Sequence, residues 1–315
     1  MVNCKICAQE FESDRSLHAH LKFHQMRMVE YYQSQYPRYD LFSKNLILFK
    51  NKEQYFSDDF NSRENLKLWL NSCSIEETTS YLTNLFKARK EKKGWKYSPT
   101  QVELRTVLFP PVQFFHKVFG DYFTFCKSLG LENRFDIFPN SPILSEPVCN
   151  KKDFSIFVDT REQIPLRFSY PIEIKTLNFG DYAFSDSSLS CDCHIERKSL
   201  NDFIGTLSGG ITRFRNEIER AIAHDSYLIV VVERNINDCR SFNSLADVRR
   251  NTHKMKVTPE YVFRNVRDLL QSYKKLQFLF VENREESIRV IEKIFTSKCV
   301  HERVDLQLAY DLKLL

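Results

Sequence analysis

One stretch of the chain constrains the fold more than any other: residues 179–202, which read FGDYAFSDSSLSCDCHIERKSLND. Two β-rich runs are separated here by a serine-rich segment that supplies turn residues, so the stretch predicts a β-hairpin. Residues two apart on a strand share a face, so Glu196 and Lys198 point the same way. A turn near residues 188–189 places Asp181 opposite Glu196.

Two carboxylates beside one ammonium group suit the hydrolysis of a phosphodiester. Carboxylate oxygens hold Mg²⁺ or Mn²⁺ and leave it several water ligands, and the metal lowers the pKa of a bound water. Asp181 and Glu196 are therefore the expected magnesium ligands. Lys198 is expected to position the attacking water or to stabilise charge on the phosphate. An exposed hairpin with a Glu–Lys ion pair is the alternative interpretation.

The order GDY, then ERK, then an aspartate four residues after the lysine resembles the signature of XPF-family nucleases. The sequence VDTRE at Val158–Glu162 resembles the first strand of that family, and the likeness runs from Phe154 to Phe295. The resemblance implies an α/β restriction-endonuclease-like fold, divalent-metal dependence and DNA cleavage. It also implies a catalytic core of Asp181, Glu196 and Lys198. The supporting residues that it implies are Asp159, Glu162, Arg197 and Asp202.

The segment after the hairpin predicts two helices. Ser199 can begin the first, and Asp202 lies three residues later, so Asp202 suits a capping-box partner as well as an active-site role. The second helix, ITRFRNEIERAIAH, is amphipathic with arginines off its apolar stripe. The family resemblance favours Arg213 among them as a DNA contact.

The N-terminal residues 1–26 carry four metal-ligand side chains with the spacing C-x2-C-x12-H-x3-H: Cys4, Cys7, His20 and His24. This spacing suits tetrahedral Zn²⁺, whose binding supplies folding energy that so short a segment lacks. The pattern resembles a two-Cys two-His zinc finger of ββα form. The positions that usually read bases would be Ser13, Ser16 and Ala19, none of which pairs with a base bidentately, so protein contact is an open alternative to DNA contact.

Residues 27–135 predict a mostly helical DNA-binding region. Arg63–Asn71 reads as a core helix, and a capping-box pattern from Ser74 to Glu77 begins the next. That helix ends in a basic run around Trp95, made of Lys87, Arg89, Lys90, Lys92, Lys93 and Lys96. We expect the run to contact the DNA backbone; a solvated helix end is the alternative. Residues 98–131 resemble the small helix-turn-helix repeat found beside homing endonucleases, with a plain helical hairpin as the alternative.

Residues 136–152 contain three prolines and little periodicity, which predicts a linker. Residues 153–300 form the expected nuclease domain, and residues 301–315 its tail. The domain's further expected strands are Phe154–Thr160, Ile172–Phe179, Tyr227–Glu233 and Gln277–Glu282. Helices are expected at 258–273 and 286–295, the last clear helix, and a long polar loop at 235–257. Cys191 and Cys193 are expected to be ordinary strand residues.

Composition limits the cellular compartments and the partners that suit this protein. The net charge of +5 is compatible with nucleic acid, and nine cysteines without a regular framework favour a reducing intracellular compartment. No apolar run reaches the length of a membrane span, and the N-terminus has no signal-peptide core. We expect an intracellular protein found with DNA, in the nucleus of a eukaryote or the cytoplasm of a bacterial or viral host cell. A homodimer or a partner protein is compatible with the sequence.

The sequence predicts a metal-dependent DNA endonuclease, structure-specific in repair or recombination. The segment after Phe295 shows no paired helix-hairpin-helix motifs, which usually give the XPF family its dimer contact and branched-DNA preference. A site-specific enzyme of the homing or restriction kind is therefore an alternative. A non-catalytic DNA-binding scaffold with a nuclease fold is another, although the chain retains Asp181, Glu196 and Lys198 together.

The N-terminal spacing leads to a prediction about metal content. The four ligands should hold one zinc ion, and Cys7→Ser should lose that ion because it removes a thiolate from the tetrahedral set. Metal analysis of the purified protein measures the loss. A metal-free wild-type protein with an ordered N-terminus would contradict the prediction.

Overall fold

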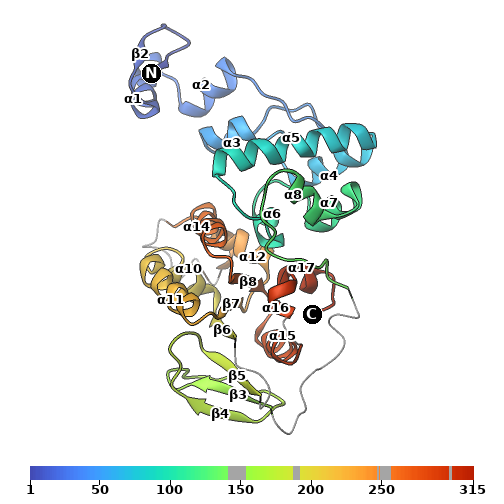
Figure 1. Cartoon of the computed structure of the whole chain (residues 1–315). Helices are drawn as coiled ribbons and strands as arrows, with labels where there is room; N and C mark the ends of the chain where they lie inside the picture. The colour runs from blue at the N-terminus through green and yellow to red at the C-terminus, as the bar shows by residue number, and fades with distance from the viewer. Residues whose placement is uncertain (141–153, 187–191, 247, 249–256, 298–299) are drawn as a thin grey trace. The chain divides into compact units, whose positions relative to one another are not determined.

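The computed structural model of the chain describes residues 1–140, 154–186, 192–246, 248, 257–297 and 300–315 (Figure 1). The chain divides into two compact units, residues 1–82 with 108–110 and residues 83–107 with 111–315. Helix α5, Ile75–Lys93, contributes residues to both. Within the part of the chain that the structure describes, no helix has the length and apolar character needed to span a membrane.

The first unit begins with the expected ββα segment. Its elements are β1 Val2–Asn3, β2 Glu10–Phe11, α1 Asp14–His20, η1 Leu21–His24, α2 Met28–Gln35, α3 Lys52–Ser57 and α4 Arg63–Ser72. Leu17 and Leu21 of the ββα segment share one apolar cluster with Tyr31, Tyr32 and Tyr55. The segment is thus packed against α2 and α3 and does not fold around an interior of its own.

Helix α4 confirms the core helix expected at residues 63–71, with one correction. Leu66 and Leu70 are buried, but Leu68 is 40% exposed because it lies on the opposite side of the helix from this pair. Two residues after α4, the predicted capping box begins α5. The backbone N–H of Ser74 donates to Glu77 Oε2 at 2.9 Å, and the N–H of Glu77 donates to Ser74 Oγ at 3.2 Å.

The second unit opens with the C-terminal half of α5 and three short helices, α6 Gln101–Thr106, α7 Val112–Phe119 and α8 Tyr122–Ser128. The expectation of short helices over residues 98–131 is confirmed. Phe86 of α5 packs against Phe115 of α7 and Phe125 of α8, each with ring centroids 5.2 Å apart. These aromatic contacts hold the basic end of α5 against the α7–α8 hairpin.

A six-stranded mixed sheet forms the centre of the second unit (Figure 1). Its strands, in the spatial order β4-β3-β5-β6-β7-β8, are β4 Ile172–Lys175, β3 Phe154–Asp159, β5 Tyr182–Asp186, β6 Cys193–Lys198, β7 Tyr227–Val232 and β8 Leu276–Phe280. Strands β6, β7 and β8 are parallel neighbours, whereas β5 runs antiparallel to β3 and β6. The unbroken apolar run of β7 is explained by its burial on both faces.

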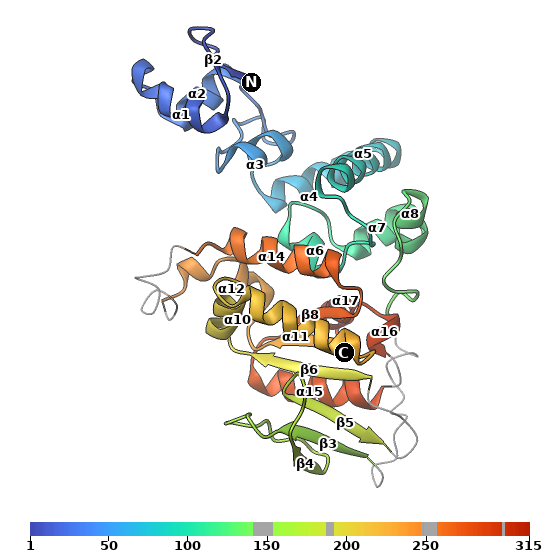
Figure 2. The same ribbon diagram turned by 60° about the vertical axis from the view of Figure 1, so that its left-hand side comes forward.

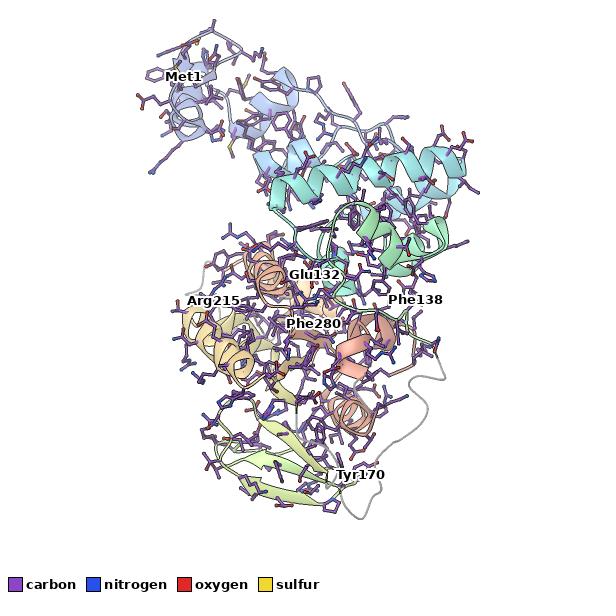
Figure 3. The ribbon with its side chains drawn as sticks, viewed as in Figure 1. Met1, Glu132, Phe138, Tyr170, Arg215 and Phe280 are labelled. Atoms are coloured by element: carbon purple, nitrogen blue, oxygen red, sulfur yellow. The ribbon has the colours of Figure 1, made fainter. Side chains whose placement is uncertain are left out.

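Helices cover the two faces of this sheet (Figure 2). One face packs against α10 Leu200–Thr206, α11 Ile211–Ala223 and α14 Pro259–Ser272. The other packs against α15 Arg284–Thr296, α16 Val300–Arg303 and α17 Leu306–Asp311. Phe280 of β8 lies in the interior on the first of these faces (Figure 3).

Two parts of the sequence prediction need correction. The expected polar loop at 235–257 contains α12 Ile236–Arg240 and the turn η2 Phe242–Ser244, with Ile236, Cys239 and Phe242 buried. The helical spacing of these apolar residues was not recognised, because the residues between them are polar and the helix is short. The expectation that α15 is the last clear helix is also wrong, because Leu306 and Ala309 of α17 are buried against the sheet. The described part of the expected linker reaches Asn140, and residues 141–152 lie outside the described residues.

Arg134 ties the helices of residues 98–135 to the sheet domain. Only 5% of the residue is exposed, and its guanidinium donates to the backbone carbonyls of Leu270, Tyr273, Lys274 and Leu276. A second link joins Arg105 Nη1 to Asp311 Oδ1 at 2.7 Å. These helices and the sheet domain therefore share an interior.

We predict that Arg134→Met destabilises the second unit by about 3–5 kcal/mol, since it leaves buried carbonyl groups without donors. Urea unfolding monitored by circular dichroism measures the loss. Arg220→Met, at an exposed position of α11, is the matched control and should stay within about 0.5 kcal/mol of wild type. Equal stability of the two variants would contradict the role given to Arg134.

Candidate active site

The β5–β6 hairpin has the predicted register. Tyr182 pairs with Ile195, so Asp181, which directly precedes β5, comes next to Glu196 of β6. The backbone N–H of Asp181 donates to Ile195 O at 2.7 Å. Gly180 just before it has a φ of +69°, and a Cβ there would lie 3.0 Å from the same carbonyl, so the motif requires glycine. The expected turn residues 188–189 lie outside the described residues.

Glu196 and Lys198 share a face of β6 and form an ion pair. Lys198 Nζ lies 2.8 Å from Glu196 Oε1 and 5.4 Å from the ring centroid of Phe214 on α11. Lys198 is only 7% exposed. The pair is therefore held in a largely dry position beside α11.

Burial makes negative charge costly at this site. Burial, assisted by the charge of the neighbouring Asp181 carboxylate, raises the pKa of Glu196 to about 8, although Lys198 opposes the rise. Burial also raises the pKa of Asp181 to about 6, although the Arg197 N–H donates to Asp181 Oδ2 at 2.7 Å. One ammonium group does not balance two buried carboxylates, and a cation would favour the ionised form of both.

The donor set fits a hard divalent cation. Among the described residues, the carboxylates at this end of the sheet form no group of three with ligand atoms within 4.8 Å of one another. An ion here would thus be held by Asp181 and Glu196, with water completing its coordination. Mg²⁺ commonly binds in this way, because it loses its water ligands reluctantly.

Arg197 occupies the alternate position of β6 and points to the opposite face. Its guanidinium lies 3.1 Å from Glu162 Oε1 and 3.0 Å from Glu233 Oε2. The structure therefore places the predicted residues Glu162 and Arg197 in an ion network behind the Glu196–Lys198 pair. Glu233 was missed by the sequence prediction, although it directly follows β7, whose carboxyl end adjoins that of β6.

The carboxylates of Asp159 and Asp202 both accept hydrogen bonds from other residues of the protein. Asp159 Oδ2 accepts from the N–H of Leu177 at 2.7 Å, and Oδ1 accepts from Arg161 Nε at 2.6 Å. Burial opposes the ionisation of Asp159, but Arg161 outweighs it and lowers the pKa of this carboxyl. Asp202 Oδ2 accepts from the Ser199 hydroxyl at 2.6 Å, while the Asp202 N–H donates back to that oxygen at 3.2 Å. Ser199 therefore caps α10 by accepting from the Asp202 N–H, and the Asp202 carboxylate binds the Ser199 hydroxyl at the start of this helix.

A third carboxylate beside the site comes from α11. Glu217 Oε1 accepts from the N–H of Gly180 at 3.3 Å, and its charge contributes to the raised pKa of Glu196. Sequence reasoning missed Glu217. The available signal was its spacing from Phe214, since residues three apart on a helix lie on one face.

The predicted DNA-binding residues differ in their exposure and in their contacts within the protein. The Lys90 ammonium donates to Leu129 O and so stabilises the end of α8. The exposed members of the basic run are Lys87, Lys92, Lys93 and Lys96, and Arg89 is half-buried. Arg213 is exposed on α11, the helix that also carries Arg215 (Figure 3).

The four predicted zinc ligands converge in the first unit. Cys4 Sγ lies 3.5 Å from His24 Nε2, Cys7 Sγ lies 3.2 Å from His20 Nε2, and the two Nε2 atoms are 3.0 Å apart. Ligands of one tetrahedral zinc ion are separated by about 3.3–3.8 Å, and this set lies within a few tenths of an ångström of that spacing, so a small outward movement would admit such an ion. One side of α1 packs against α2 of the same unit, since His18 Nε2 lies 3.0 Å from the Tyr32 hydroxyl.

The sheet domain is similar to known proteins. Residues 158–294 match the family model described as the ERCC4 domain. Two solved structures of XPF from Aeropyrum pernix, one in complex with DNA, are each 20% identical to this chain with a TM-score of 0.32. Each alignment covers 44% of this chain, and 64% and 62% of the two XPF chains respectively, so this chain spans less than two thirds of their length. No curated protein sequence matches.

The raised carboxyl pKa values lead to a prediction for the magnesium-free protein. Glu196 ionises near its ordinary pKa in the unfolded chain but at about 8 in the folded chain. Its contribution to stability is therefore fully present below the unfolded pKa and is lost as the pH rises toward about 8. Urea unfolding from about pH 5 to about pH 9 should show this decline, and Glu196→Gln should reduce it. Glu91→Gln, at an exposed position of α5, is the control. Identical pH slopes for wild type and Glu196→Gln would show that the fold does not oppose this charge.

Proposed function

We propose that the chain is a divalent-metal-dependent DNA endonuclease with Asp181, Glu196 and Lys198 as its catalytic residues. The observation that supports this most directly is the meeting of these three side chains beside α11. The match of residues 158–294 to the ERCC4 domain, the nuclease domain of the XPF family, supports the same reaction class.

Each residue of the proposed centre has a separate task. Asp181 and Glu196 hold Mg²⁺ or Mn²⁺, which when bound neutralises phosphate charge and lowers the pKa of a bound water. Lys198 supplies a positive charge and N–H donors beside these carboxylates, where it orients a water or stabilises charge on the phosphate. Arg197 is a positioning residue, because its backbone N–H holds the Asp181 carboxylate while Glu162 fixes its side chain.

Binding of DNA is the second part of the proposal. The exposed lysines of the basic run and Arg213 contact the phosphate backbone, whereas Lys90 serves the fold. The N-terminal ligands hold a structural Zn²⁺. Asp159 supports the first strand through Arg161 and Leu177. The match to the ERCC4 domain supports a role in DNA repair or recombination, with cleavage at branched DNA.

Single-turnover cleavage assays test the catalytic assignment. Lys198→Ala should lower the rate about 10²–10⁴-fold, since a lost positioning or proton-transfer group typically has that effect. Its DNA binding and metal affinity should largely persist. Glu196→Gln should lower both metal affinity and cleavage, because it removes charge that the cation needs. Lys175→Ala on the exposed edge strand β4 is the matched control and should cleave like wild type.

The substrates decide among the remaining possibilities. Linear duplex, fork, flap and Holliday-junction DNA should be compared with Mg²⁺ and with Mn²⁺. Cuts tied to the branch point support a structure-specific enzyme, whereas one fixed site in the linear duplex supports a homing or restriction-like enzyme. Wild-type rates in Lys198→Ala would show that the triad is wrong. A wild-type protein that cuts none of these DNAs with either metal would favour the non-catalytic scaffold.

A further inference from the structure

A second group of metal-ligand side chains lies at the other end of β6. Asp192 directly precedes this strand, while Glu196 and Lys198 lie near its carboxyl end. His301 and Glu302 come from α16, which lies near the beginning of β6 (Figure 2). One ligand atom from each of Asp192, His301 and Glu302 can be chosen so that all three lie within 4.8 Å of one another.

The imidazole of His301 is the unusual member of this group. Its side chain is 4% exposed, and neither ring nitrogen makes a hydrogen bond, although Nε2 lies 3.4 Å from Asp192 Oδ1. Burial of a polar group without a hydrogen-bond partner is unfavourable, so such groups in native proteins usually have a function. Imidazole nitrogens are common metal ligands, and one from His301 lies close enough to Asp192 and Glu302 for all three to contact a single ion.

The surrounding structure fixes His301 in this position. Its backbone carbonyl accepts from Gln277 Nε2 of the buried strand β8 at 2.6 Å. Its ring meets the Tyr227 ring edge-on, with centroids 5.0 Å apart. The N–H of Tyr227 in turn donates to Asp192 O at 2.7 Å. The backbones that carry the imidazole and the Asp192 carboxylate are therefore both held by the sheet.

The charges of the group also favour a cation. Two carboxylates, Asp192 and Glu302, lie beside one imidazole. A divalent ion would neutralise both carboxylates and would give the unpartnered imidazole nitrogen a bond.

We infer that Asp192, His301 and Glu302 form a second zinc site, separate from both the N-terminal ligands and the proposed magnesium centre. One imidazole nitrogen and two carboxylate oxygens are a ligand set that Zn²⁺ accepts, with water in the fourth position. The ion would link α16 to the start of β6, far along the strand from Lys198. Its role is to stabilise the fold.

Metal analysis of the full-length chain tests this inference. Wild-type protein dialysed against zinc-free buffer should retain two zinc ions per chain. Cys7→Ser and His301→Gln should each retain one, and the double variant none. His194→Gln is the control, because His194 is a half-buried imidazole of β6 whose Nδ1 lies 2.8 Å from the Ser226 hydroxyl. This control and Glu196→Gln should both keep two ions.

Thermal unfolding gives a second readout. Addition of Zn²⁺ to metal-depleted Cys7→Ser should raise its Tm, and the same addition should leave the Cys7→Ser/His301→Gln double variant unchanged. Asp192→Asn, at a partly exposed position, serves in the same assays if His301→Gln does not fold. If neither His301→Gln nor Asp192→Asn changes the zinc content or the Tm, the three residues bind no metal and form only an ion pair. Loss of the second ion in Glu196→Gln, with retention in His301→Gln, would place it in the nuclease centre and overturn the inference.

Discussion

The Glu196–Lys198 ion pair is the interaction on which the candidate active site depends. Removing one partner of a buried ion pair typically costs about 3–5 kcal/mol, whereas replacing the whole pair with apolar residues is often neutral. A buried ion pair is therefore weak evidence that the fold needs it for stability, and it is better explained by a role of the two side chains in a reaction. Asp181 adds to the electrostatic cost, because it is a second carboxylate at a site where burial already raises the pKa of Glu196.

The backbone around this pair explains how the carboxylates are brought together. Gly180 adopts a positive φ and approaches Ile195 closely, which lets the chain enter β5 with Asp181 beside β6. Alternation along β6 then sends Arg197 to the other face, where Glu162 and Glu233 bind it on two sides. One strand therefore carries the proposed chemistry on one face and its support on the other.

Much of this arrangement follows from local sequence. The hairpin register, the GDY glycine and the Glu196–Lys198 face depend on a period of two and on turn composition, which a single sequence displays. The partners of these residues come from distant segments, and no local pattern marks them. Glu217 looks like any polar residue of an amphipathic helix until α11 packs beside Gly180. Helix α12 was missed for a related reason, since its burial depends on α14 and the sheet more than on its own composition.

The residues proposed for DNA binding and those proposed for catalysis belong to the same unit. The basic end of α5 is fixed by Phe86 to α7 and α8, and Lys90 adds a bond to the end of α8. Arg134 then joins this helical region to α14 and β8 through buried carbonyl groups. A flexible tether would let a phosphate-binding surface move independently of the active site. A shared interior prevents that movement, so DNA held by the α5 lysines would meet the carboxylates of β5 and β6 at a fixed spacing set by the fold.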